Sequence, residues 1–128
     1  MTEAVSTPAL KVAFVLDDEK VIASTLAIIL KNAGFDAHAF FSGQEAVDSL
    51  DKLRPDLLIT DVIMPGMNGI EAALITQTKL PQCKILLFSG QATTADLLEK
   101  ARAQGHDFDI LAKPIHPTDL IEKIRTQP

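Results

Sequence analysis

Short apolar runs alternate along the chain with longer segments in which apolar residues recur every three or four positions. The short runs are rich in Val, Ile, Leu and Phe, which is typical of strands buried on both faces of a sheet. The longer segments have helical periodicity, and several of them end near Gly or Pro. This pattern predicts strands at Lys11–Leu16, Phe35–Phe41, Asp56–Thr60, Lys84–Phe88 and Phe108–Ala112, and helices at Glu19–Asn32, Gln44–Leu53, Gly69–Lys79, Thr94–Gln104 and Thr118–Thr126.

The regular alternation of strand and helix predicts an α/β fold with five parallel strands and five helices. Parallel strands are joined by right-handed crossover connections, so helices are expected to cover both faces of the sheet. The segment Phe35–Phe41 is less apolar than the others because it includes Asp36 and His38. We therefore expect it at an edge of the sheet, with His38 facing solvent.

Length and composition are those of one globular domain. A chain of 128 residues can bury roughly two-thirds of its unfolded surface in a single core. Residues 1–9 contain Thr, Ser, Pro and Glu without any apolar period, so residues 1–10 are predicted to be a flexible arm and residues 11–126 the domain. The only cysteine, Cys83, precedes an apolar strand and is expected to pack as a small hydrophobic residue.

The net charge of -5 gives no electrostatic reason to expect binding to nucleic acid or to an anionic membrane. No apolar segment has the length of a membrane span, and the N-terminus lacks the features of a secretory signal. We therefore expect a cytoplasmic location and protein partners. The three histidines lie in different predicted units without the spacing of metal ligands, so no metal site is predicted from them.

Four predicted strands end at residues suited to phosphoryl and metal chemistry. Asp17 and Asp18 follow the first strand, Asp61 the third, Ser89 the fourth and Lys113 the fifth. The carboxyl ends of parallel strands meet at one edge, where α/β sheets bind ligands. Carboxylates are hard ligands for Mg2+, and crowded carboxylates raise one another's pKa unless a cation offsets their charge. The set therefore predicts an aspartyl-phosphate site that uses Mg2+.

Taken one at a time, these residues have simpler interpretations. Asp17 and Asp18 are also typical of a helix start, where they complement the helix dipole. Ser89 is equally consistent with an ordinary loop, and Lys113-Pro114 with a plain strand exit. Their joint occurrence, in order, at successive strand ends favours the common site.

The most specific segment is Asp61–Gly69, which has the form Asp-x-x-Met-Pro-x-Met-x-Gly. Together with the acidic pair, Ser89 and Lys113-Pro114, it makes the chain from Lys11 to Arg125 resemble the receiver domain of two-component response regulators. The resemblance implies a doubly wound, flavodoxin-like sheet with strand order 2-1-3-4-5. It also implies a protein that takes a phosphoryl group from a sensor histidine kinase or a histidine phosphotransfer protein.

The same resemblance implies roles for individual residues. Asp61 would be the phosphoacceptor, and Ser89 and Lys113 would contact the phosphoryl group, with a cis peptide at Pro114. The implied Mg2+ ligands are Asp18 directly, Asp17 through water, Asp61, and Ile63 through its backbone carbonyl. The chain would catalyse its own phosphorylation and slow dephosphorylation, while acting primarily as a signalling switch.

The implied switch moves Ser89 and changes the face formed by the predicted fourth helix, fifth strand and fifth helix, to which a downstream protein would bind. Ile110 occupies the position where the family usually has Tyr or Phe, so Phe108, two residues earlier, is the alternative aromatic element. Ile63 and Gln91 occupy two positions that tune hydrolysis. Apolar Ile63 cannot orient an attacking water, which predicts a long-lived phospho-aspartate.

Two other functions are compatible with these residues. One is a magnesium-dependent phosphatase or phosphotransferase with an Asp nucleophile, but Asp61 has no second acid close by and the chain has no cap insertion. The other is a receiver-like interaction module that acts without phosphorylation. The sequence also leaves open a homodimer, and whether this is a stand-alone receiver or a domain of a longer chain.

Overall fold

The structure, a computed structural model, describes residues 10–90, 94–106, 108–113 and 115–126; for Thr94, Ala95 and Thr126 it describes only the backbone. Gln91, Pro114 and residues 1–9 of the expected arm lie outside these ranges, so what is expected of them stays a prediction. In the part of the chain that is described, no helix is long and apolar enough to cross a membrane.

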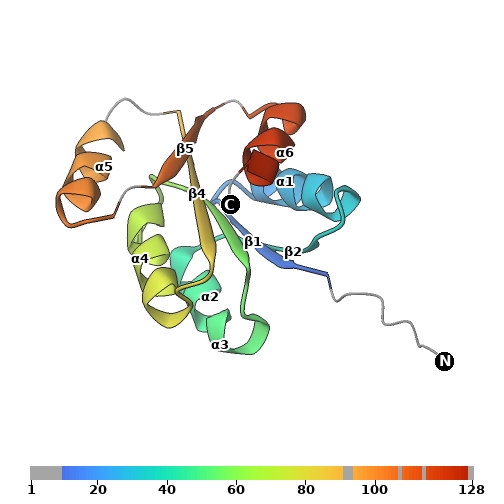
Figure 1. Ribbon diagram of the computed structural model, residues 1–128, viewed down its shortest axis with the longest axis horizontal. Coiled ribbons are helices and arrows are strands. Elements are labelled where there is room, and N and C mark those ends of the chain that lie inside the picture. Colours follow the sequence, from blue (N-terminus) through green and yellow to red (C-terminus); the bar gives the residue numbers. More distant parts are fainter. Residues whose placement is uncertain (1–9, 91–93, 107, 114, 127–128) are drawn as a thin grey trace.

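Five parallel strands form one sheet in the order β2-β1-β3-β4-β5, as expected (Figure 1). The strands are β1 (Val12–Leu16), β2 (Asp36–Phe40), β3 (Leu57–Asp61), β4 (Lys84–Ser89) and β5 (Asp109–Ala112). The prediction that the less apolar strand lies at an edge is confirmed by β2. The strand order changes direction at β1, because β2 and β3 lie on opposite sides of it, and such a point leaves a crevice beyond the strand ends.

Helices cover both faces of this sheet (Figure 1). They are α1 (Lys20–Asn32), α2 (Gly43–Asp48), α3 (Leu50–Leu53), α4 (Gly69–Lys79), α5 (Thr94–Ala103) and α6 (Pro117–Thr126). The expected number of five was wrong, since the described residues form six helices. The predicted helix Gln44–Leu53 is interrupted at Ser49, whose Oγ donates to the carbonyl of Glu45 at 3.0 Å and so competes with the regular backbone bond.

Two apolar clusters, one on each face, hold the layers together. Under α1 and α6 lie the alternate strand residues Val15, Ile59, Leu86 and Phe88, packed with Leu26 and Leu120. Under α2, α4 and α5 lie Phe14, Leu58, Val62 and Leu87, packed with Leu50 and Ile70. Because successive strand residues point to opposite faces, the continuous apolar runs fill both clusters at once.

Two expectations about single residues had different outcomes. Cys83 is buried as predicted, and burial, followed by the charge of Asp56, raises the pKa of its thiol to about 12. His38 was expected to face solvent but is half-buried: its ring lies edge-on to Phe14, with centroids 6.2 Å apart. The register explains this, because His38 pairs with Phe14 and both point toward the same core.

The loop between β3 and α4 folds tightly because of Gly69. The amide of Gly69 donates to the carbonyl of Val62 at 2.9 Å, and a Cβ at Gly69 would overlap the carbonyl oxygen of Asp61. That same oxygen accepts a hydrogen bond from Thr60 Oγ1 at 2.9 Å. Gly66 serves a different purpose, since its φ of 72° requires the left-handed region while the space around it is open.

We expect Gly69→Ala to destabilise the fold by about 3 kcal/mol, at the upper end of the cost of overpacking. The gain in helix propensity, about 1 kcal/mol, is too small to offset this clash. Gly66→Ala is the matched control and should cost roughly 1–2 kcal/mol, because only backbone strain is added. Urea denaturation measures both values, and a cost for Gly69→Ala no larger than that for Gly66→Ala would contradict the assignment.

Candidate phosphoryl and metal site

The acidic pair lies where β1 passes into α1. The amide of Asp17 donates to the carbonyl of Phe40 at 3.1 Å, which continues the β1–β2 pairing by one residue. Asp17 is fully buried, and its Oδ1 accepts a hydrogen bond from the amide of Glu19 at 2.9 Å. Asp18 is exposed, so the two neighbouring acids present one buried and one solvent-facing carboxylate.

Asp61 is the last residue of β3 and is only 7% exposed. Its Oδ1 accepts a hydrogen bond from the amide of Val62 at 2.9 Å. The backbone of Asp61 is held on both sides, by pairing with Phe88 of β4 and by the contact of its carbonyl with Thr60 Oγ1. The carboxylate therefore has a fixed position at the carboxyl edge of the sheet.

Lys113 follows β5 and bridges the two buried acids. Its Nζ lies 3.2 Å from Asp61 Oδ2 and 3.3 Å from Asp17 Oδ2. In both acids, Oδ1 accepts a hydrogen bond from a backbone amide, and Oδ2 accepts one from the Lys113 ammonium. Charge-assisted bonds of this kind are stronger than neutral ones, so one cation orients two carboxylates.

Oxygen atoms of Asp17, Asp18 and Asp61 all lie within 4.8 Å of one another. The three carboxylates carry a formal charge of −3 when ionised, of which Lys113 offsets one unit. The remaining −2 matches a divalent cation, and an all-carboxylate donor set with a solvent-facing member suits Mg2+, which keeps several waters. These residues fit the predicted metal.

The ionisation of the buried groups follows from their contacts. Burial raises the pKa of Asp17, and the charge of Asp61 adds to this, although the Glu19 amide and Lys113 act in the opposite direction. Burial by itself would lower the pKa of Lys113, but its hydrogen bonds and charge interactions with Asp61 and Asp17 outweigh this and raise it. The Lys113 side chain is therefore an ammonium at neutral pH.

The structure brings together four of the predicted residues directly: Asp17, Asp18, Asp61 and Lys113. Ser89 ends β4 beside them, 8% exposed, and its carbonyl accepts from the amide of Lys113 at 3.0 Å. Ile63, two residues after Asp61, is 41% exposed. Gln91 falls outside the described residues.

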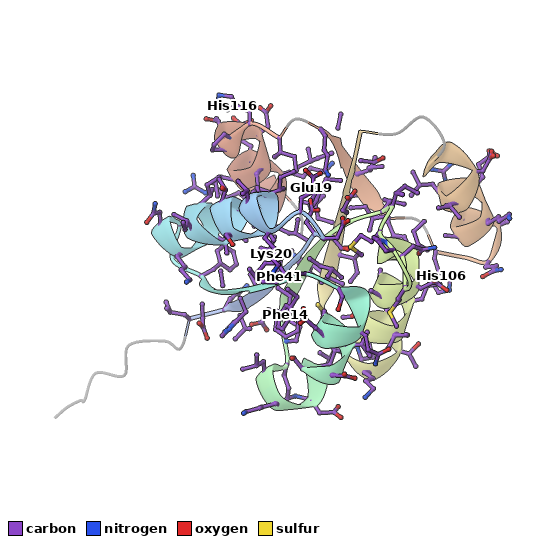
Figure 2. All side chains as sticks on the ribbon, turned by 180° about the vertical axis from the view of Figure 1, so that it is seen from behind. Phe14, Glu19, Lys20, Phe41, His106 and His116 are labelled. Atoms are coloured by element: carbon purple, nitrogen blue, oxygen red, sulfur yellow. The ribbon has the colours of Figure 1, made fainter. Side chains whose placement is uncertain are left out.

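The predicted switch residues lie on β5 and just before it. Ile110 is 40% exposed on the outer strand, whereas Phe108 is half-buried against the cluster under α4 and α5. The ring of Phe108 stacks on that of His106, with centroids 6.2 Å apart and an interplanar angle of 11°. His106 lies before β5 and His116 before α6, far from each other (Figure 2).

Sequence reasoning missed the backbone donors that fix the acids. The amides of Glu19 and Val62 each bind one Oδ1, and no residue type signals this because every residue except Pro has an amide. It also missed the role of Gly69, which brings α4 against the carbonyl of Asp61. The Gly at the end of the Asp61–Gly69 motif is visible in the sequence, but the motif does not indicate which backbone atom it lies against.

Comparison with known proteins places these features in a family. The family model of the response regulator receiver domain matches residues 13–125. The chemotaxis protein CheY of Thermotoga maritima is 32% identical over 111 residues, covering 86% of this chain and 91% of that protein. The DNA-binding response regulator MtrA of Mycobacterium tuberculosis is 29% identical over 113 residues, which cover 88% of this chain but only 48% of MtrA. The chain thus spans about half the length of MtrA.

Solved structures have the same fold. The chemotaxis protein CheY4 of Vibrio cholerae superposes with a TM-score of 0.80 at 25% identity, covering 91% of this chain and 98% of that one. The response regulator TrrA of Thermotoga maritima, solved in complex with Mg2+-BeF, gives a TM-score of 0.77 at 28% identity, covering 91% and 97%.

We expect Asp17→Asn to stabilise the protein at pH 7 in the absence of divalent cations. Burial raises the pKa of Asp17, so the folded state favours the neutral form, and the ionised carboxylate is destabilising above that pKa. Asparagine is always neutral and keeps an Oδ1 acceptor for the Glu19 amide. As the pH falls through the raised pKa, wild type gains the neutral form too, and the difference should shrink.

Urea denaturation with and without Mg2+ measures this effect. Mg2+ at a hundredfold excess over its Kd should stabilise wild type by about 2.7 kcal/mol and Asp17→Asn by less, because one ligand is gone. A variant less stable than wild type at pH 7 without Mg2+ would show that the contact with Lys113 outweighs the cost of burial.

Proposed function

Because the chain belongs to the response regulator receiver domain family, we propose that Asp61 accepts a phosphoryl group with the help of Mg2+ and so switches the domain between two states. Receiver domains work with histidine kinases or phosphotransfer proteins and with downstream effectors. The observation that carries the proposal is the convergence of three carboxylates and the Lys113 ammonium at one edge of the sheet. We infer that the donor here is a sensor histidine kinase or a histidine phosphotransfer protein.

In the proposed reaction a carboxylate oxygen of Asp61 attacks the phosphorus of the donor. The new oxygen–phosphorus bond forms as the bond from phosphorus to the donor's leaving group breaks, and that group departs with the bonding electrons and takes up a proton. The carboxylate must be ionised to act as nucleophile. Lys113 lies 3.2 Å from Asp61 Oδ2, so it holds this carboxylate in position and can then pair with the phosphoryl oxygens.

Asp17, Asp18 and Asp61 would hold the metal, with the backbone carbonyl of Ile63 as a further proposed ligand. When bound, Mg2+ supplies positive charge that offsets the charge on the phosphoryl oxygens during transfer. Asp17 is already oriented by the Glu19 amide, and Asp18 is exposed and free to turn toward a hydrated ion. Little reorganisation of the protein is needed, which is the condition for electrostatic catalysis.

We propose that the signal leaves the site through Ser89 and Lys113, which end or follow neighbouring strands. Their backbones are joined by the 3.0 Å bond from the Lys113 amide to the Ser89 carbonyl. A movement of Ser89 toward the phosphoryl group would therefore displace β5 and alter the face made of α5, β5 and α6. Ile110 is exposed on β5, and Phe108 is the nearby aromatic residue, so both are proposed switch positions.

The proposal is tested by incubation with acetyl phosphate and Mg2+ followed by intact-mass analysis. Wild type should gain the mass of one phosphoryl group, and Asp61→Asn should gain none. Asp119→Asn, which changes an exposed acid of α6 away from the site, is the matched control and should label like wild type. Absence of labelling in wild type would favour the phosphorylation-independent module, and rapid turnover of acetyl phosphate without labelled protein would favour the phosphatase.

We further expect a slow loss of the phosphoryl group, because the exposed side chain of Ile63 has no polar atom to orient an attacking water. Ile63→Asn supplies such an atom and should speed the decay several-fold, while Ile63→Leu should leave it unchanged. The decay is followed by intact mass after the phosphoryl donor is removed. Equal rates in the Asn and Leu variants would contradict this assignment of Ile63.

A further inference from the structure

The position of Lys113 depends on more than the two carboxylates. In the proposed reaction Asp17 and Asp61 are also the groups that hold the metal and, at Asp61, the phosphoryl group. Their attraction for Lys113 therefore changes during the reaction. A contact that holds the ammonium in place throughout must come from a group that neither titrates nor binds the metal.

Phe88 provides such a contact. The Nζ atom of Lys113 lies over the ring of Phe88, 5.1 Å from its centroid. Phe88 is fully buried in the cluster under α1 and α6, and it pairs with Asp61 on β3 and with Leu111 on β5. An aromatic face attracts a cation through its quadrupole, and the attraction is greater where water is excluded. The side chain of Lys113 is only 20% exposed.

The two residues after Phe88 hold the rest of Lys113. The carbonyl of Ser89 accepts the Lys113 amide at 3.0 Å. The Lys113 stem runs along Gly90, since a Cβ built on Gly90 would lie 3.3 Å from Lys113 Cβ and 3.7 Å from its Cδ. Three consecutive residues at the end of β4 thus contact the backbone, the stem and the ammonium of one lysine.

We propose that Phe88 is a positioning residue for phosphoryl transfer, which keeps the Lys113 ammonium directed at Asp61 through a cation–π contact. This inference rests on the proposed function. The backbone of Phe88 pairs with the acceptor Asp61, but its ring acts on the reaction through Lys113. Loss of the ring should leave the lysine charged but less well directed, so the rate of phosphorylation at saturating donor should fall more than the affinity for the donor.

The decisive experiment replaces Phe88 with phenylalanines carrying one, two and three ring fluorines, introduced only at that position. Fluorine withdraws charge from the ring face and weakens the cation–π contact while nearly preserving the ring's shape. The rate of labelling at saturating acetyl phosphate should fall stepwise, to about one-tenth with three fluorines. The same series at Phe14, equally buried but in the opposite cluster, is the control and should give no trend.

A second measurement needs neither metal nor donor. A ring beneath Nζ should shift the NMR signals of the Lys113 Cε protons upfield, and Phe88→Leu should abolish the shift while Phe14→Leu retains it. A flat fluorine series at position 88, or Cε protons without the shift in wild type, would overturn the proposal. Failure of wild type to label would instead overturn the proposed function, and with it the role of Phe88 in transfer.

Discussion

The site depends on a balance between repulsion among three carboxylates and their attraction to one ammonium. Asp17 and Asp61 lie buried close together, and the charge of Asp61 adds to the effect of burial in raising the pKa of Asp17. Lys113 contacts both at 3.2–3.3 Å and offsets one unit of that charge. The compensation is incomplete, and the negative charge that remains is what a divalent cation would offset in the proposed function, since a phosphoryl donor is itself anionic.

The parallel sheet brings the residues of this site together from distant parts of the chain. Residues 17, 61, 89 and 113 are far apart in sequence, but each follows or ends a strand, so the register of the sheet brings them to one edge. The change in strand order at β1 keeps that edge open between the loops after β1 and β3. Gly69 completes the loop after β3 because it lets α4 begin against the carbonyl of Asp61.

Much of this could be predicted from residue patterns, and the failures have identifiable causes. The helix Gly69–Lys79 was predicted with its observed ends, and Asn68 and Glu71 form a full capping box at its start. The helix Gln44–Leu53 was predicted as continuous, but a side-chain bond of Ser49 to Glu45 interrupts it, and periodicity does not register such bonds. His38 was misjudged because its exposure depends on the register that pairs it with Phe14.

The acids and the lysine were identifiable because their chemistry is unusual at strand ends. The groups that orient them were not, since backbone amides carry no residue signal and Phe88 resembles any other apolar residue of a core strand. The difference is physical: chemistry is carried by residue type, whereas orientation is set by the neighbours that the fold brings into contact. In this domain Phe88, the apolar residue before Ser89, makes two kinds of contact. It fills the core under α1 and α6, and its ring face also lies beneath the one cation on which the arrangement of Asp17 and Asp61 depends.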